Sequence, residues 1–177
     1  MKKVKRSVIF FTMHVVLFLL ITACKHSGSS DNSEIVVHID KNKLVTINRY
    51  LVNKDLDIMR HFVERKSWKM SFSNYGYFYE VFDEGENPKI TDHKQIICDC
   101  SISLLDGTVC YEIKNKVFVV SGSDEISGLH HAVKLLGKGG KARFIFPPHL
   151  AYGIQGDFNK IPPRAILLYN IHVKDNK

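Results

Sequence analysis

Lys138-Gly-Gly-Lys-Ala-Arg-Phe-Ile-Phe-Pro-Pro-His-Leu-Ala-Tyr-Gly153 is the stretch of sequence from which the fold is best deduced. Residues 141–146 are mostly apolar and predict a strand, and the Pro-Pro pair that follows predicts a loop. A second apolar run, residues 165–173, predicts another strand after that loop. Two strands that flank a Pro- and Gly-rich loop are therefore expected at the C-terminal end.

A helix is expected directly before this stretch. Ser-Asp-Glu at 123–125 is typical of a helix N-terminus, and the glycines at 137, 139 and 140 would end the helix. In that position the carboxylates of Asp124 and Glu125 are expected to interact favourably with the helix dipole and not to act in acid–base chemistry. The apolar residues between these limits share one helical face: Ile126, Leu129, Val133 and Leu136.

Further strands are expected upstream of the helix. Residues 75–82 are aromatic and β-branched, residues 95–105 end at the hairpin signal Asp106-Gly107, and residues 117–120 form a short apolar run. Several antiparallel strands with one helix place the domain, expected at 70–177, in the α+β class.

Residues 41–69 have the spacing of helices rather than strands. One apolar series begins at Leu44 and a second at Ile58, both at helical intervals. We therefore expect two short helices, with Asn53 or Asp55 capping the second. Helices this short are marginal alone, so they are expected to dock on another surface.

Residues 1–23 are expected to be a lipoprotein signal peptide. Four basic residues precede an apolar run over 8–23, which is too short for a comfortable membrane span. The run ends in Ile21-Thr22-Ala23-Cys24, which is similar to a bacterial lipobox, so Cys24 would be lipidated. Simple signal cleavage beside an incidental cysteine is the alternative. Residues 24–40 would be the lipid anchor and a flexible spacer, because 25–32 are Ser-rich and contain no apolar residue.

A lipidated Cys24 would place the domain in a bacterial cell envelope, because two or more acyl chains hold a protein on a bilayer. Lys25 stands where some bacteria place an aspartate that retains lipoproteins at the inner membrane. Its presence favours the outer membrane. The domain is expected on the periplasmic or extracellular side.

The charge of the chain excludes a nucleic-acid partner. The formal net charge is +7, but the first 23 residues hold four basic residues and no acidic one. The remainder has 21 basic against 18 acidic residues, a balance that concerns solubility and not polyanion binding. With 45% hydrophobic residues and only 5 prolines, the chain is neither disordered nor collagen-like.

The C-terminal sequence carries a family resemblance. The stretch 138–153, followed by Gly156, by Ile161-Pro162-Pro163 and by Ala-Ile-Leu-Leu-Tyr at 165–169, resembles the C-terminal half of an FK506-binding-protein (FKBP) type peptidyl-prolyl cis-trans isomerase. The resemblance implies a half-barrel antiparallel sheet wrapped around the helix at 126–136, with a hydrophobic pocket between them. With its lipobox and short helical segment, the chain most resembles the gliding-motility-associated lipoproteins of this superfamily.

The resemblance implies an activity that needs no cofactor and no metal. The barrier to rotation about a peptide bond is about 18–20 kcal/mol, and an X-Pro bond turns over unaided in tens to hundreds of seconds. An apolar pocket weakens the solvation that supports the planar amide, and it can bind the twisted state preferentially. Proline-containing polypeptides are the expected substrates.

The resemblance also assigns roles to individual residues. Tyr152 matches the tyrosine whose hydroxyl bonds a substrate carbonyl, and Ile126 matches the helix-start residue whose backbone N–H bonds another. These two are the expected catalytic residues. Core packing remains the alternative for Ile126, and equally for Leu129 and Tyr169, because all three lie on periodic apolar faces. The expected substrate-binding residues form the walls and floor of the pocket: Leu129, Ile161, Tyr169, Phe118, Cys100, Cys110 and Tyr111.

Several positions depart from the family pattern. Cys100 stands in place of a tyrosine, Cys110-Tyr111 in place of a phenylalanine-aspartate pair, and Lys116 in place of a wall phenylalanine. Asp157 and Lys160 occupy loop positions that are often apolar. A looser and wetter pocket is therefore expected, with feeble catalysis.

Cys98, Cys100 and Cys110 allow three interpretations. Buried free thiols that act as small hydrophobes are one. A cross-strand Cys100–Cys110 disulfide, implied by the hairpin register of the family, is the second, and a metal site with a histidine is the third. A redox role would require thiols that react with an alkylating reagent.

Two functions follow from these observations. The first is a membrane-anchored isomerase that assists the folding of exported or envelope proteins. The second is a weakly active or inactive binding module in an envelope complex for motility or secretion. The lost aromatic walls favour the second, whereas the retained Tyr152, Ile126 and Ile161 favour the first.

Overall fold

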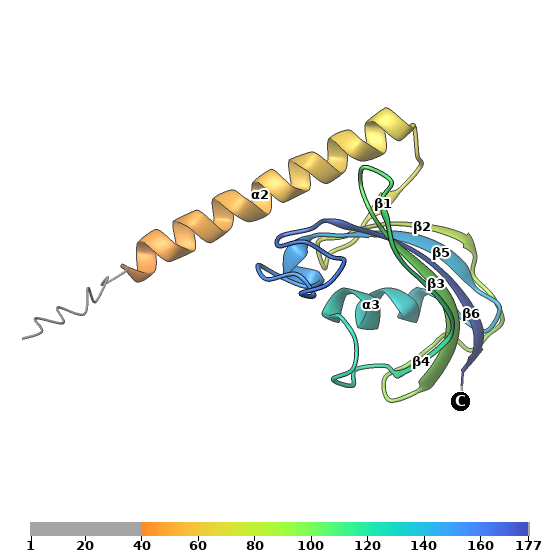
Figure 1. Ribbon diagram of the computed structural model, residues 1–177. Helices are drawn as coiled ribbons and strands as arrows, with labels where there is room; N and C mark the ends of the chain where they lie inside the picture. Colours follow the sequence, from red (N-terminus) through yellow and green to blue (C-terminus); the bar gives the residue numbers. More distant parts are fainter. Residues whose placement is uncertain (1–39, 177) are drawn as a thin grey trace, which may run out of the picture. The chain divides into compact units, whose positions relative to one another are not determined.

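One antiparallel sheet dominates the computed structural model, which describes residues 40–176 (Figure 1). Within this part of the chain the sheet has six strands in the order β1-β2-β5-β6-β3-β4. The strands are β1 (Ser71–Phe72), β2 (Phe78–Asp83), β3 (Gln95–Leu104), β4 (Val109–Val119), β5 (Lys141–Phe146) and β6 (Leu167–Asn176). The strands expected at 95–105 and 141–146 are confirmed, whereas the run at 117–120 is only the end of the longer β4.

Strand β3 shows how the sequence orients the sheet. Alternate residues of β3 are buried, from Ile96 to Ile102, and Cys98 and Cys100 lie on this buried face. Asp99 and Ser101 point to the opposite face, as the period-two geometry of a strand requires. The sheet therefore has one apolar, concave face and one largely polar, outer face.

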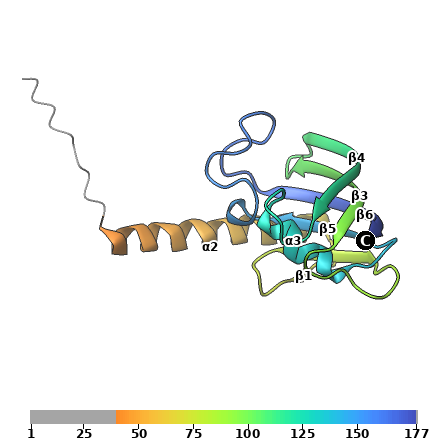
Figure 2. The same cartoon turned by 90° about the horizontal axis from the view of Figure 1, so that it is seen from below.

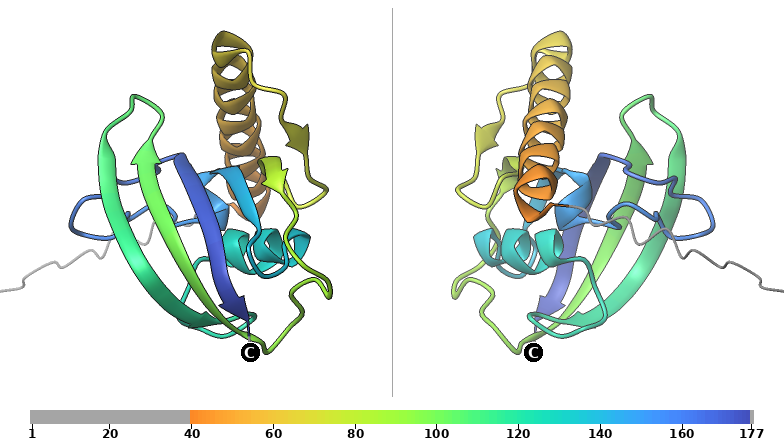
Figure 3. Two further views of the ribbon diagram at one scale, coloured as in Figure 1. Left: turned by 90° about the vertical axis from the view of Figure 1, so that its right-hand side faces the viewer. Right: turned by 90° about the vertical axis from the view of Figure 1, so that its left-hand side faces the viewer.

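The concave face is covered by helix α3 (Ser127–Ala132), which continues as the 3₁₀ turn η1 (Val133–Leu135). Figures 1 and 3 show the sheet curving around this helix. The close approach requires a glycine, because a Cβ on Gly128 would lie 2.6 Å from a ring carbon of Phe146. The α+β half-barrel expected from the resemblance is confirmed.

Residues 41–66 form one continuous helix, α2 (Lys41–Lys66), and the expectation of two short helices was wrong. Neither glycine nor proline interrupts these residues, so nothing in the backbone ends the first helix. Asp40 is the N-cap and accepts a hydrogen bond from the backbone N–H of Asn42 at 3.0 Å. Ser67 ends the helix in the left-handed conformation, just after the basic Arg65 and Lys66.

The second half of α2 packs on the outer face of the sheet. Met59, Phe62 and Val63 form a small apolar core with Phe78 of β2 and Ile145 of β5. In contrast, residues 41–50 are exposed along their whole length. Figure 2 shows this first half of α2 extending beyond the sheet. The two halves of one helix therefore have different environments.

The expected signal peptide, lipidated Cys24 and spacer lie outside the described residues. Within residues 40–176, no helix combines the length and the apolar character that a membrane span needs. The membrane contact expected at Cys24 therefore stays a prediction.

Candidate functional site

Tyr152 lies on a loop that the preceding elements hold in place. Strand β5 leads into the 3₁₀ turn η2 (Pro148–Leu150), and the backbone N–H of Gly153 donates to the carbonyl of Pro148 at 2.8 Å. The phenol of Tyr152 is half-buried. Burial raises its pKa above the ordinary value, so the hydroxyl stays protonated at neutral pH and can donate a hydrogen bond.

The start of helix α3 lies beside this phenol. Ile126 is the N-cap of α3, in extended conformation, and its carbonyl accepts from the N–H groups of Leu129 and His130. Among the described residues, the N–H of Ile126 has no acceptor, as expected for a helix start. A hollow of about 330 Å³ lies here, lined by residues 123–127, Ala151 and Tyr152. The structure thus brings the two expected catalytic residues to one surface hollow.

The expected pocket residues gather beneath this hollow but do not line it. Leu129 and Tyr169 are fully buried, and all members belong to the same apolar core. The members with at most 5% of their surface exposed are Leu129, Ile161, Tyr169, Phe118, Cys100 and Cys110. The floor is therefore filled by the protein's own side chains, in place of the looser and wetter pocket expected from the sequence.

Tyr169 brings a polar group into this floor. Its hydroxyl is buried next to that of Tyr152 but makes no hydrogen bond of acceptable geometry within the described residues. Burial raises the pKa of Tyr169 well above its usual range. A polar group buried in this way is costly unless it finds a partner.

Tyr111 does not line this hollow, and its side chain bonds to the loop after Tyr152. Its hydroxyl donates to the carboxylate of Asp157, and the ammonium of Lys160 lies 5.2 Å from the centre of its ring. Asp157 also accepts from the backbone N–H of Ile161 at 2.7 Å. Asp157 and Lys160, which the sequence suggested would wet the pocket, instead fasten the loop to β4.

Lys116 forms an ion pair with Glu125 at the edge of the site. The side chain of Glu125 is only 6% exposed and that of Lys116 19%. Burial lowers the pKa of Lys116, but the hydrogen bond and charge of Glu125 outweigh it and raise that pKa overall. Glu125 thus pairs with a strand residue, in addition to standing at the helix start. No sequence spacing indicated this pair, because Lys116 belongs to strand β4 and Glu125 to the segment before α3.

The three cysteines of the described part are free and buried, which agrees with the first of the three interpretations, buried thiols that act as small hydrophobes, and not with a Cys100–Cys110 disulfide. The cause is the register: Cys100 lies opposite Ile113, and an irregularity of β3–β4 pairing falls next to Cys110. The hydrogen bond with Cys98 lowers the pKa of Cys100. No cluster of metal-ligating side chains occurs among residues 40–176. Burial favours the structural interpretation of these thiols over a redox role.

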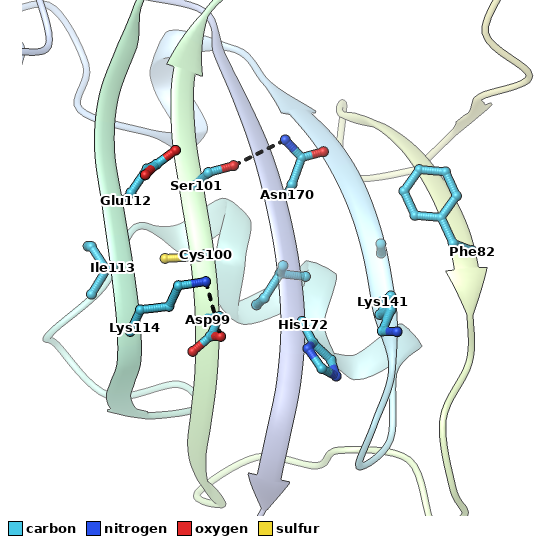
Figure 4. A pocket seen from close by; sticks show the side chains of 12 residues that line it. Phe82, Asp99, Cys100, Ser101, Glu112, Ile113, Lys114, Lys141, Asn170 and His172 are labelled. Carbon is cyan, nitrogen blue, oxygen red and sulfur yellow. Dashed lines mark hydrogen bonds and ion pairs between the residues drawn. The ribbon is translucent and has the colours of Figure 1, made fainter.

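A second hollow, of about 400 Å³, lies on the outer face of the sheet (Figure 4). Two pairs of its polar groups are bound to each other: Asp99 pairs with Lys114 at 3.4 Å, and the amide of Asn170 donates to Ser101 at 3.2 Å. This hollow contains neither Tyr152 nor Ile126, the two residues expected to bind the substrate carbonyls. The hollow beside Tyr152 is therefore the candidate active site.

Comparison with known proteins agrees with this geometry. Residues 86–174 match the family described as FKBP-type peptidyl-prolyl cis-trans isomerase. The FkpA isomerase of Buchnera aphidicola from Schizaphis graminum is 33% identical over 122 residues, which cover 67% of this chain and 47% of that protein. The FkpA isomerase of Escherichia coli K12 is 28% identical over 131 residues, covering 70% and 46%. The chain spans about half the length of these relatives.

Solved structures show the same fold. The crystal structure of Escherichia coli FkpA has a TM-score of 0.60 at 24% identity, covering 76% of this chain and 64% of that one. A peptidyl-prolyl cis-trans isomerase of Pseudomonas syringae has a TM-score of 0.60 at 22% identity, covering 71% and 96%. At these identities the similarity concerns the fold.

Proposed function

Since the chain belongs to the FKBP-type peptidyl-prolyl cis-trans isomerase family, we propose that it catalyses the cis–trans isomerisation of X-Pro bonds in polypeptides. The observation that carries this proposal is the hollow in which the neutral phenol of Tyr152 and the unpaired N–H of Ile126 lie together. Both groups are donors, so they can hold substrate carbonyls on either side of the prolyl bond. The apolar residues beneath them exclude water.

Rotation about the bond requires no nucleophile. The planar amide is supported by water, and transfer of the proline to an apolar surface removes that support. Donors that bind the twisted state better than the planar one then lower the barrier, and each 1.36 kcal/mol gives about tenfold in rate. The side chains that fill the floor must move before a proline ring can enter, so we expect a slow enzyme.

The test is an isomerisation assay on a short X-Pro peptide with the full chain. We expect acceleration over the spontaneous rate, and a several-fold lower kcat/KM for Tyr152→Phe. Tyr50→Phe is the matched control, because Tyr50 is an exposed tyrosine on α2. Wild-type protein without acceleration would contradict the proposal.

A binding module is the second candidate, and the closed floor favours it. Leu129 and Tyr169 have no exposed surface, so a proline ring has no ready place to insert. Calorimetric titration with the same peptide separates the two functions. Binding without acceleration would indicate a module that holds a partner, for example in an envelope motility or secretion machine.

For the anchoring of the protein we propose a lipid on Cys24 and a place in the cell envelope, on the outer membrane. The support is the sequence Ile21-Thr22-Ala23-Cys24 and the polar segment 25–32 that follows. Mass spectrometry of the mature protein should find Cys24 acylated at the N-terminus, and Cys24→Ala should release the protein from the membrane fraction. An unmodified Cys24 would contradict this assignment.

A further inference from the structure

The carboxylate of Asp55 and the guanidinium of Arg164 join two parts of the chain that are 109 residues apart. One nitrogen of Arg164, Nη2, donates to both carboxylate oxygens of Asp55, at 3.1 and 2.9 Å. Asp55 is 7% exposed and lies in the middle of α2. His149 also lies near Asp55, but burial lowers the pKa of His149, so the neutral ring does not compete for the carboxylate.

Arg164 closes the loop that follows Tyr152. We call Gly153 and Arg164, the two residues that meet where this loop begins and ends, its neck. The backbone N–H of Arg164 donates to the carbonyl of Gly153 at 3.0 Å, and Gly153 is the residue directly after Tyr152. Arg164 adopts a left-handed backbone with φ of 57°, which a residue with a side chain rarely does. The side chain that binds Asp55 and the backbone that binds Gly153 thus belong to one strained residue.

The loop between these neck residues is tied together internally. Asp157 accepts from the N–H of Ile161 at 2.7 Å and from that of Asn159 at 2.9 Å, and its own N–H donates to the carbonyl of Ile161. A Cβ on Gly156 would lie 2.2 Å from that same carbonyl. These bonds hold the loop in one conformation, and the hydrogen bond between Arg164 and Gly153 connects it to Tyr152.

Helix α2 is fixed where it meets this neck. Met59 and Phe62, four and seven residues after Asp55, are buried against the sheet. They lie on the same helical face as Asp55, because residues four apart are neighbours on a helix. The apolar contact thus fixes the position of α2 along its axis and its rotation about that axis, and with them the place of Asp55 beside Arg164.

From these contacts we propose that Asp55 and Arg164 are a positioning pair, through which α2 holds the Tyr152 loop in its working geometry. The pair rests on the proposed isomerase function, but it extends the site beyond residues 86–174, the part that matches the family. Helix α2 is then a component of the isomerase site. An exposed ion pair would contribute little. Here the Asp55 side chain is only 10% exposed, although that of Arg164 is 34% exposed, and both carboxylate oxygens are bound.

The test compares Asp55→Asn with Asp57→Asn in the full chain. Asp57 is a matched control, because it pairs with Arg60 on the same helix at 2.7 Å while both side chains are exposed. A displacement of about 1 Å in a site can cost up to about 100-fold in rate, so we expect Asp55→Asn to lower kcat about 10- to 100-fold, with a smaller change in KM. Asp57→Asn should leave both constants unchanged.

Hydrogen exchange provides a readout that does not depend on activity. In Asp55→Asn the backbone amides of Arg164 and Ile161 should exchange faster, while those of β3 keep their protection. Arg164→Lys retains the positive charge, so this variant should fold even if Asp55→Asn does not. It should show a smaller fall in kcat and a smaller increase in the exchange of the same amides. Wild-type protein without activity would refute the isomerase proposal. Hydrogen exchange alone would then show whether Asp55 and Arg164 position the loop. Exchange that matches that of Asp57→Asn would overturn the positioning role.

Discussion

Two polar contacts replace the aromatic walls at this site. Lys116 pairs with Glu125, and Tyr111 donates to Asp157, so each contact joins β4 to a segment that borders the hollow. Three of the residues that depart from the family pattern, Lys116, Tyr111 and Asp157, form these contacts. Their polarity does not wet the pocket, because each polar group is bound to another.

The buried ion pair leads to a prediction on stability and rate. Lys116→Met leaves the carboxylate of Glu125 buried without its partner, so the free energy of unfolding should fall by about 3–5 kcal/mol. The double variant Lys116→Met/Glu125→Leu removes both charges and should recover wild-type stability. Its apolar wall should also raise kcat/KM. Urea unfolding and the isomerisation assay measure both effects, and a single variant as stable as wild type would refute the role of the pair.

Tyr169 allows a second prediction at the scale of one group. Its buried hydroxyl makes no hydrogen bond within the described residues, and such a group costs about 1–3 kcal/mol. Tyr169→Phe should therefore stabilise the protein by about 1 kcal/mol, measured as a higher urea midpoint, while Tyr50→Phe on the exposed face of α2 should not. A destabilised Tyr169→Phe would show instead that the hydroxyl bonds to Tyr152 in solution.

Among the elements, β5 was predicted within its observed limits and α2 was not. Residues 141–146 are bounded by glycines and prolines. These residues interrupt regular secondary structure locally, so the limits of the strand can be deduced from the sequence alone. Asp55 looks like a helix cap in sequence, because aspartate is a common cap. Its actual partner, Arg164, lies 109 residues further on, and no local pattern can reveal such a contact.

The docking of α2 can be tested at the same scale. Phe62 is 3% exposed and contacts Trp68 edge-to-face at 5.5 Å between ring centroids. Phe62→Ala should lower the free energy of unfolding by about 3–5 kcal/mol, because it leaves a cavity between helix and sheet. Tyr50→Ala, in the exposed first half of α2, should change the free energy of unfolding by less than about 0.5 kcal/mol. Equal effects of the two variants in urea unfolding would show that α2 is not docked.

Considered as a whole, the molecule separates its chemistry between the two faces of the sheet. The sequence predicted the antiparallel sheet and the helix that it surrounds, because the family resemblance at 138–169 implied both. It also identified Tyr152 and Ile126, which the structure places at one hollow. The closure of the floor could not be predicted, since it depends on how six buried side chains from different elements fill one space. The outer face, in contrast, carries the ion pairs of Asp99 beside the apolar contact with α2.

These outer charges make the stability of the whole protein depend on pH. The N–H of Asn115 donates to Asp99 at 2.9 Å, and Lys174 lies 3.1 Å away, so the pKa of Asp99 falls to about 2 from 3.8. A lowered folded-state pKa stabilises the protein above the unfolded value, and this contribution is lost as the pH falls towards 2.

Asp99→Asn should therefore be less stable than wild type at pH 6, and the difference should disappear near pH 2. The measurement is the urea midpoint as a function of pH. Ser101→Ala, a neutral change on the same face, is the control and should follow the wild-type pH dependence. Parallel curves for wild type and Asp99→Asn would show that this carboxylate carries no part of the acid sensitivity, because a group with equal folded and unfolded pKa values contributes no slope.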